Sequence, residues 1–147
     1  MKLLVATDFS PQTIKVLDVA RRLALALDAN LCVLHVATPE PQFKTYTAGE
    51  RQDREETAAE YREEHRLVHE AADSMRDAGI EATALMVKGS PAKAIIDEAD
   101  ELDADLIIMG SHGFGAVFKM LLGSVSSAVL KKAGRPVLIV PAERDRE

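Results

Sequence analysis

The stretch Leu106-Ile107-Ile108-Met109 is a short apolar run that leads directly into a glycine loop beginning at Gly110. Four other runs of the same kind lie along the chain: Leu3–Thr7, Leu31–Val36, Ala82–Val87 and Pro136–Val140. All five are almost continuously apolar instead of alternating. This is the pattern of strands in a parallel sheet whose two faces are both covered by helices.

Helical patterns separate these runs. In the first, Ser10 is expected as the N-cap and Pro11 at the first helical position, and the third begins in the same way at Ser90-Pro91. The second is long and charged, from about Glu50 to Ala78, and the last runs from Ser124 to Lys132 before Gly134.

Each pattern has an apolar side that should face the sheet. The expected inward residues are Ile14, Leu17, Ala20, Ala24 and Leu27 in the first helix; Tyr61, His65, Val68, Ala72 and Met75 in the second; Ala94, Ile95 and Ala99 in the third; and Val125, Ala128 and Val129 in the last. The order βαβαβαβαβ predicts one doubly wound α/β domain over residues 1–147.

Two long segments without a periodic pattern interrupt this order. They are Thr38–Gly49, which contains Phe43 and Tyr46, and Ser111–Leu122. Segments of this length in a compact domain are usually lids or binding loops. Phe43 and Tyr46 are expected to cover the sheet edge or to close over a pocket, and the sequence does not decide between these roles.

Composition restricts the functional class. The formal net charge is −6, which argues against broad contact with nucleic acid or with an anionic membrane. Cys32 is the only cysteine, so neither an intrachain disulfide nor a cysteine metal site is expected, as in a reducing cytoplasm. No stretch approaches the roughly 18 apolar residues of a membrane span. We therefore expect a soluble cytoplasmic protein.

The glycine loop is the strongest candidate for a binding site. Gly110, Gly113, Gly115 and Gly123 lie between the end of one strand and the helix that starts at Ser124. Glycines allow the backbone to approach a ligand closely, and a helix N-terminus offers free N–H groups to an anion. A plain flexible loop with a serine cap is the alternative interpretation. The spacing matches neither a P-loop nor a dinucleotide fingerprint.

Asp8 is the candidate partner of this loop. In open α/β sheets, ligands lie beyond the carboxyl ends of the strands where the strand order reverses. Asp8 ends the first strand and Gly110 ends the fourth. If these strands are neighbours, one crevice holds both residues. The carboxylate could then accept hydrogen bonds from ribose hydroxyls or hold a bound Mg²⁺. A turn before the first helix is the alternative role for Asp8.

The pattern Gly110-x₂-Gly113-x₉-Gly123-Ser124, followed by Val125-Ser126, resembles the ATP-binding signature of the universal stress protein family. The resemblance extends over nearly the whole chain. It includes Leu4-Val5-Ala6-Thr7-Asp8-Phe9-Ser10, Leu34-His35-Val36, Gly89-Ser90-Pro91-Ala92 and Pro136-Val137-Leu138-Ile139-Val140-Pro141. On this basis we expect a Rossmann-like three-layer sandwich with four helices and a five-stranded parallel sheet in the order 3-2-1-4-5.

The resemblance also implies a nucleotide site. Gly110, Gly113, Gly123 and Ser124 would contact the phosphates, and Val125 and Ser126 would add amide or hydroxyl donors. Asp8 would meet the ribose or the adenine end, and Val36 and Met109 would flank the base, with Thr7 and Val87 lining the pocket. The expected ligand is ATP, or else ADP or AMP, with Mg²⁺ bound through the phosphates. Phe114 and Phe118 depart from the basic residues common in this loop, and fewer positive charges there would either weaken triphosphate affinity or favour a smaller nucleotide.

The histidines and the cysteine have less specific interpretations. His65 and His69 are four residues apart and could share a metal, but surface positions are favoured because a third ligand is not evident. His35 is interpreted as a core histidine and Cys32 as core packing. His112, inside the glycine loop, is a candidate phosphate contact, with a structural role equally open. The charged run Arg51–Arg66 is interpreted as a solvated helix face with Glu–Arg pairs.

No set of nucleophile, base and acid is evident, so the sequence indicates a nucleotide-dependent regulatory protein with at most slow ATP hydrolysis. Two alternatives are an adenylyl-transfer or pyrophosphatase enzyme and a dimeric interaction protein with an empty loop. The last strand, Pro136 to Pro141, lacks the charges that protect an edge strand, so it predicts a homodimer by pairing with its own copy. The resemblance implies the same dimer.

Overall fold

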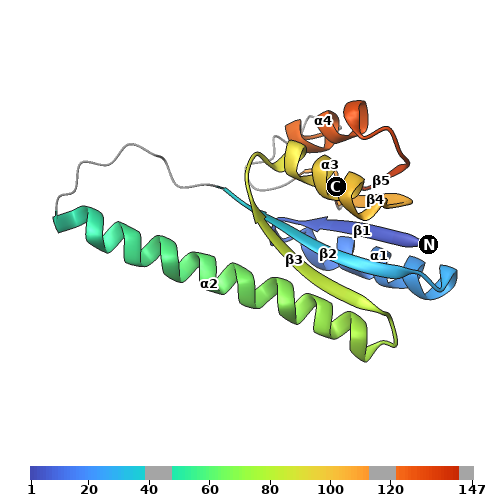
Figure 1. Ribbon diagram of the computed structural model, residues 1–147, viewed down its shortest axis with the longest axis horizontal. Helices are drawn as coiled ribbons and strands as arrows, with labels where there is room; N and C mark the ends of the chain where they lie inside the picture. The colour runs from blue at the N-terminus through green and yellow to red at the C-terminus, as the bar shows by residue number, and fades with distance from the viewer. Residues whose placement is uncertain (39–47, 113–121, 143–147) are drawn as a thin grey trace, which may run out of the picture.

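The sheet has five parallel strands in the order β3-β2-β1-β4-β5, as expected (Figure 1). The computed structural model describes residues 1–38, 48–112 and 122–142, with only the backbone for 48–56. The strands are β1 (Lys2–Thr7), β2 (Asn30–Ala37), β3 (Ala82–Lys88), β4 (Leu106–Gly110) and β5 (Val137–Val140). The described helices are α1 (Thr13–Leu27), α2 (Ala48–Asp77), α3 (Pro91–Leu102) and α4 (Ser124–Lys132).

Helices cover both faces of the sheet, with α1 and α2 on one and α3 and α4 on the other (Figure 1). Each face has its own apolar core. One contains Leu3, Val5, Val33 and Ile108 under α1 and α2; the other contains Leu4, Leu34, Ile107 and Met109 under α3 and α4. The alternation of side chains along each strand divides its apolar residues between the two cores. Continuous apolar runs are therefore required, as the sequence indicated.

Cys32 belongs to the core under α3 and α4, as expected. Its burial raises the pKa of the thiol above its usual value, because the thiolate is poorly solvated there. A thiol that stays neutral is a weak nucleophile, so packing accounts for this residue.

Helix α1 begins later than expected. Thr13 is its first residue and Gln12 its N-cap, and the amide of Thr13 donates to the carbonyl of Ser10 at 2.9 Å. Ser10 and Pro11 therefore form a turn before the helix instead of its cap. The inward face also differs, because Ile14 is 82% exposed and Val16 is buried in its place. Leu27, also expected to face inward, is 45% exposed.

The other helices agree more closely with the sequence. Ser90 is the N-cap of α3 and Pro91 its first residue, and α4 has the expected bounds. In α2 only the later part of the expected stripe is buried, at Val68, Ala72 and Met75. Tyr61 and His65 are exposed, and toward its N-terminus α2 projects past the end of the sheet (Figure 1).

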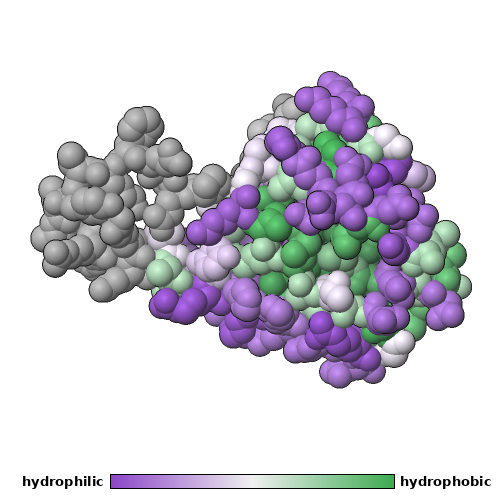
Figure 2. All heavy atoms as spheres, viewed as in Figure 1, coloured by the Kyte–Doolittle hydropathy of each residue, from purple (hydrophilic) through white to green (hydrophobic). Residues whose placement is uncertain are grey.

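The coloured part of the α2 surface is strongly hydrophilic, while the strip between α2 and α3 is apolar (Figure 2). This strip follows β3, an edge strand whose residues Ala84, Leu85, Met86 and Val87 are half-buried. On α2, Arg66 pairs with Glu63 and Glu70, which confirms Glu–Arg pairing for the described part of the charged run. None of the helices described here is long and apolar enough to cross a bilayer.

The strand order reverses between β1 and β4. Because β1 pairs with β4 directly, the ends of these strands open into the same crevice, with α1 on one side and α3 and α4 on the other. Most of the two long loops, including Phe43, Tyr46, Phe114 and Phe118, lies outside the described residues.

Candidate functional site

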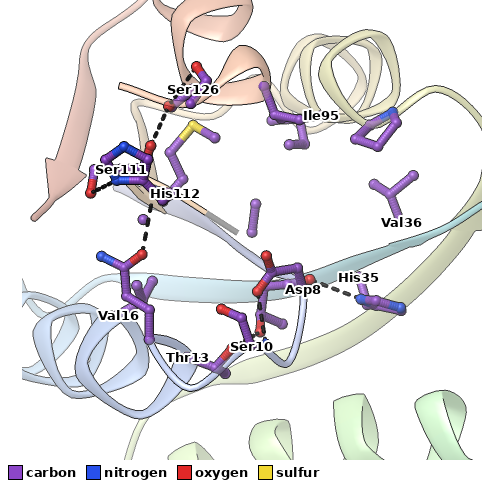
Figure 3. Close-up of a pocket in the computed structure, with 18 of the residues that line it drawn as sticks. Asp8, Ser10, Thr13, Val16, His35, Val36, Ile95, Ser111, His112 and Ser126 are labelled. Carbon is purple, nitrogen blue, oxygen red and sulfur yellow. Dashed lines mark hydrogen bonds between the residues drawn. The ribbon is translucent and has the colours of Figure 1, made fainter. Parts of the chain in front are cut away.

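A cavity of about 710 Å³ occupies this crevice (Figure 3). This volume suits a ligand of nucleotide size. Its wall is formed by the carboxyl ends of β1, β2 and β4, the N-terminal parts of α1, α3 and α4, and Glu64 of α2. The residues involved are Ala6, Thr7, Asp8, Ser10, Gln12, Thr13, Val16, Leu34, His35, Val36, Thr38, Glu64, Pro91, Ile95, Met109, Gly110, Ser111, His112, Leu122, Gly123, Ser124, Val125, Ser126 and Ser127.

Ser111 connects the three elements that surround the glycine loop. Its carbonyl accepts hydrogen bonds from the amide of Gly123 at 2.7 Å and from the hydroxyl of Ser126 at 2.8 Å. Its own amide donates to the carbonyl of Val140 at 2.9 Å, and its hydroxyl oxygen accepts from the amide of Ala142 at 3.1 Å. The end of β4 is thereby held against the start of α4 and the end of β5.

Gly123 is the N-cap of α4, and its backbone is extended, with φ −73° and ψ 172°. A side chain is therefore compatible with this backbone but not with the neighbouring atoms. A Cβ atom would lie 3.2 Å from the carbonyl oxygen of Ser111, which is already fixed by two hydrogen bonds. Glycine lets the end of β4 and the start of α4 approach each other, so that the first turn of α4 faces the cavity.

Gln12 holds the opposite side of the same loop. Its Nε2 donates to the carbonyl of Val140 at 2.7 Å, and its Oε1 lies 3.4 Å from the amide of His112. A Cβ atom at Gly110 would lie only 2.7 Å from that Oε1. The glycine at the end of β4 therefore makes room for the Gln12 side chain.

Asp8 lies in the middle of the cavity (Figure 3). One carboxylate oxygen, Oδ1, accepts a hydrogen bond from the amide of Ser10 at 2.9 Å, so Asp8 has the turn role that the sequence left open as the alternative. No residue that the structure describes bonds to Oδ2. The residue before Asp8, Thr7, also stabilises this turn. The hydroxyl oxygen of Thr7 lies 3.1 Å from the hydroxyl oxygen of Thr13 and accepts a hydrogen bond from the amide of Phe9 at 3.2 Å. Asp8 thus combines a structural bond with an oxygen available to a ligand.

Most of the candidate residues from the sequence come together in this cavity. Those that line it are Thr7, Asp8, Val36, Met109, Gly110, His112, Gly123, Ser124, Val125 and Ser126. Val87 does not, because β3 lies beyond β2 from the crevice and Val87 packs under the α3 side of the sheet. Gly113 is outside the described residues. Ser126 is 2% exposed and its hydroxyl is used by Ser111, which leaves its backbone amide for a ligand.

Sequence reasoning missed several wall residues, among them Gln12, His35, Glu64, Ile95 and Ser111. Ser111 could have been included because it lies inside the glycine stretch. Ile95 was predicted to lie on the inward face of its helix. It contributes both to the apolar core and to the cavity wall. Gln12 and Glu64 carry no local signal, since each reaches the cavity only through the packing of its helix.

The described wall of the cavity contains the carboxylates of Asp8 and Glu64 but no lysine or arginine. An anion here would be held by the N-terminus of α4, by backbone amides and by hydroxyls. His112 belongs to this end, with Nδ1 3.0 Å from the hydroxyl of Ser111. Its Nε2 is buried and has no hydrogen-bond partner among the residues that the structure describes. Those residues contain no cluster of three metal-binding side chains.

Comparison with known proteins identifies the family. The sequence model of the universal stress protein family matches residues 1–141 of this chain. The chain belongs to the universal stress protein family. It is 33% identical to universal stress protein YxiE of Bacillus subtilis over 144 residues, covering 95% of this chain and 97% of that protein.

Solved structures of universal stress proteins and their relatives have the same fold. Protein MJ0577 of Methanocaldococcus jannaschii superposes with a TM-score of 0.82 at 27% identity, covering 98% of this chain and 97% of the other. A universal stress protein from Archaeoglobus fulgidus, solved in complex with dAMP, has a TM-score of 0.63 at 27% identity, covering 95% and 96%. This structural neighbour therefore binds an adenine nucleotide.

Proposed function

We propose that this universal stress protein binds an adenine nucleotide in the cavity between β1 and β4 and acts as a nucleotide-dependent regulatory module. The observation that supports this most directly is the arrangement of the cavity. The described ends of the glycine loop, at Gly110 and Gly123, and the first turn of α4 line the same cavity as Asp8, at the reversal of the strand order. The dAMP complex of the structural neighbour from Archaeoglobus fulgidus supports the same ligand class.

The phosphates would lie at the start of α4. Gly123 and Ser124 begin the helix there, and the amides of its first turn have no partners within the helix. The hydroxyl of Ser124 and Nε2 of His112 are further candidate donors. Because the described wall lacks lysine and arginine, Mg²⁺ bound to phosphate oxygens would offset part of the negative charge of ATP. The same lack of cationic side chains favours ADP or AMP when Mg²⁺ is absent.

The nucleoside would lie over the carboxyl ends of β1 and β2. Val36, Ile95 and Met109 are apolar residues of the cavity wall, suited to the faces of an adenine ring. Asp8, which lies between the base and the phosphate ends, would accept ribose hydroxyls through Oδ2. The hydroxyl of Ser111 lies 3.0 Å from Nδ1 of His112, but no described residue bonds to Nε2 of that ring to orient it as a base. Binding is therefore the proposed activity, and any hydrolysis would be slow. The cytoplasm is the expected compartment because the single cysteine, Cys32, is buried and free.

ATP is expected to raise the melting temperature of the purified protein. A ligand at about 100 times its dissociation constant adds roughly 2.7 kcal/mol to the free energy of unfolding. For a domain of this size that is a shift of roughly 5 to 15 °C. Circular dichroism with nucleotide-free protein, with and without Mg-ATP, measures it. Absence of both a shift and calorimetric heat at millimolar Mg-ATP would refute nucleotide binding.

A panel of nucleotides separates the proposed function from its alternatives. The nucleotide-free protein is titrated with ATP, ADP, AMP and GTP, each with and without Mg²⁺. Preference for the adenine nucleotides supports the proposal, and equal affinity for GTP argues against the adenine site. Native mass spectrometry detects a nucleotide that co-purifies, whereas turnover of a second substrate would indicate an enzyme.

Asp8→Asn is expected to weaken adenine nucleotide binding by about 1–3 kcal/mol, because the substitution removes the charged acceptor of the ribose hydroxyls. Asparagine retains an oxygen for the amide of Ser10, so the turn after β1 should persist. Isothermal titration calorimetry measures the loss. Asp105→Asn, at the opposite end of the sheet beside Lys2, is a matched control. If Asp8→Asn binds the nucleotide with wild-type affinity, this carboxylate does not contact the ligand.

A further inference from the structure

His35 is a buried histidine whose protonation is coupled to the cavity wall. It lies near the end of β2, is 5% exposed and lines the cavity. Its Nδ1 lies 2.8 Å from the carbonyl oxygen of Thr7, and because a carbonyl only accepts, Nδ1 carries a hydrogen. The ring of Phe9 packs against it with centroids 4.8 Å apart. Phe9 has φ +57°, an unfavourable backbone region for a bulky residue that recurs at functional sites.

The second ring nitrogen of His35 faces a carboxylate. Nε2 lies 3.2 Å from Oε2 of Glu64, and it makes no hydrogen bond to any residue that the structure describes. In the neutral ring, with the hydrogen on Nδ1, Nε2 is an acceptor, and two acceptors at this distance repel each other. A proton on Nε2 converts the contact into an ion pair. Nε2 and the carboxylate of Glu64 therefore attract each other only when the ring carries this second proton.

The residues that the structure describes place few other charges beside this pair. Asp8 is the other carboxylate in the described wall of the cavity. The neighbour of His35 on β3 is Met86, and the start of α1 contributes the uncharged Ser10 and Thr13. Lys88, at the end of β3, lies over the ring of Tyr61, 4.7 Å from its centroid. Glu64 is thus the carboxylate that lies against Nε2. Histidine is the side chain whose charge ordinarily changes between about pH 5 and 8.

Glu64 lies at a distinctive point on α2. Among the described side chains of the helix, the first buried one is Val68, one turn later, and toward its N-terminus the helix projects past the sheet (Figure 1). The contact between His35 and Glu64 is therefore a polar link between β2 and α2 at the boundary of the packed region. Both residues also belong to the wall of the cavity. Loss of this link would release the wall on the α2 side.

We propose that His35 and Glu64 form a proton-dependent clamp that sets the affinity of the cavity for its nucleotide. The proposal rests on the proposed function and adds its regulation by pH. Below the pH at which His35 loses its proton, the ion pair holds α2 against the nucleoside end of the cavity. Above it, the bare Nε2 repels the carboxylate and the wall opens. Affinity therefore falls as pH rises, and by linkage nucleotide binding takes up protons.

Calorimetric titration with ATP from about pH 5.5 to 8.5 tests the clamp in the wild type, His35→Gln, Glu64→Gln and Glu64→Ala. ATP itself gains or loses a proton in this pH range. The test is therefore the difference between the pH dependence of the variants and that of the wild type. Between pH 6 and 8, the affinity of the wild type for ATP should fall by a factor that is about fivefold or more larger than the fall measured for His35→Gln. Glu64→Gln should bind equally well at both pH values, because its amide can donate to neutral Nε2. Glu64→Ala should be weak throughout.

Glu60→Gln, an exposed position on α2 outside the described cavity wall, should behave as the wild type. Identical pH profiles of the wild type and His35→Gln, or equal affinities of Glu64→Gln and Glu64→Ala, overturn the clamp. A second readout needs no nucleotide: ¹⁵N NMR of the imidazole, assigned through His35→Gln, should show hydrogen on both ring nitrogens of His35 near pH 6. A neutral His35 at that pH also overturns the clamp. Failure of ATP to bind at every pH refutes the proposed function instead.

Discussion

Replacing Gly123 by valine should reduce the affinity for ATP at least about 100-fold, or roughly 2.7 kcal/mol, while the sheet stays folded. The backbone at Gly123 does not require glycine, since its φ of −73° suits any residue. The obstacle is steric. Its Cβ would lie 3.2 Å from the carbonyl oxygen of Ser111, and the γ carbons of valine would fill space beside the first turn of α4. This is where the phosphates are proposed to bind.

Isothermal titration calorimetry with Mg-ATP measures the loss, and circular dichroism verifies that the variant is folded. Gly123→Ala should give an intermediate loss, because a single methyl group requires the Ser111 carbonyl to move by only a few tenths of an ångström. Leu130→Ala, on the exposed side of the same helix, is the matched control. If Gly123→Val binds ATP with wild-type affinity, the start of α4 is not the phosphate site.

Ile139→Pro should convert the proposed homodimer into monomers. β5 is at the edge of the sheet, and its residues Val137, Leu138 and Ile139 are half-buried. The carbonyls of Pro136 and Val140 accept hydrogen bonds from Ile107 and Ser111, so even-numbered positions of β5 face β4. By the alternation of a parallel pair, the amide and carbonyl of Ile139 point to the open edge. Proline there removes a donor from the dimer ladder while sparing the bonds to β4.

Sedimentation velocity at tens of micromolar protein distinguishes dimer from monomer. Ile139→Val, which retains the backbone amide, is the matched control and should remain dimeric. Leu138→Lys should also favour the monomer by placing a charge at the edge, at some cost in stability, because Leu138 packs partly against the core under α1. A wild-type protein that sediments as a monomer would refute the homodimer. A dimer that persists in Ile139→Pro would place the interface elsewhere, for example at the other edge strand, β3.

Much of the site follows from features that lie close together in sequence. Continuous apolar runs specify strands buried on both faces, and the Ser90-Pro91 start of α3 follows from backbone rules. The glycine stretch between β4 and α4, with its resemblance to a family signature, located the candidate phosphate end. Asp8 was identified as a candidate because it directly follows β1. Each of these inferences depends on the conformational preference of a few adjacent residues, and the structure places Asp8, Gly110 and Gly123 in the wall of one cavity.

Other features exist only in the folded chain. The pairing of β1 with β4 places Asp8 across from Gly123, residues that are more than 100 positions apart in sequence. The start of α1 was misplaced because the turn at Ser10 and the contact of Gln12 with Val140 outweigh the local capping preference of Ser10-Pro11.

By itself, the sequence determined which segments form strands and helices and where the chain offers glycines and a helix N-terminus to an anion. These are local properties of the backbone and of apolar periodicity. Only the tertiary structure decided that His35 meets Glu64, that Val87 stays outside the cavity and that the hydroxyl of Ser126 is used within the protein. Each of these depends on which strand or helix lies alongside another, because hydrogen bonds and ion pairs require contact between side chains that the sequence separates.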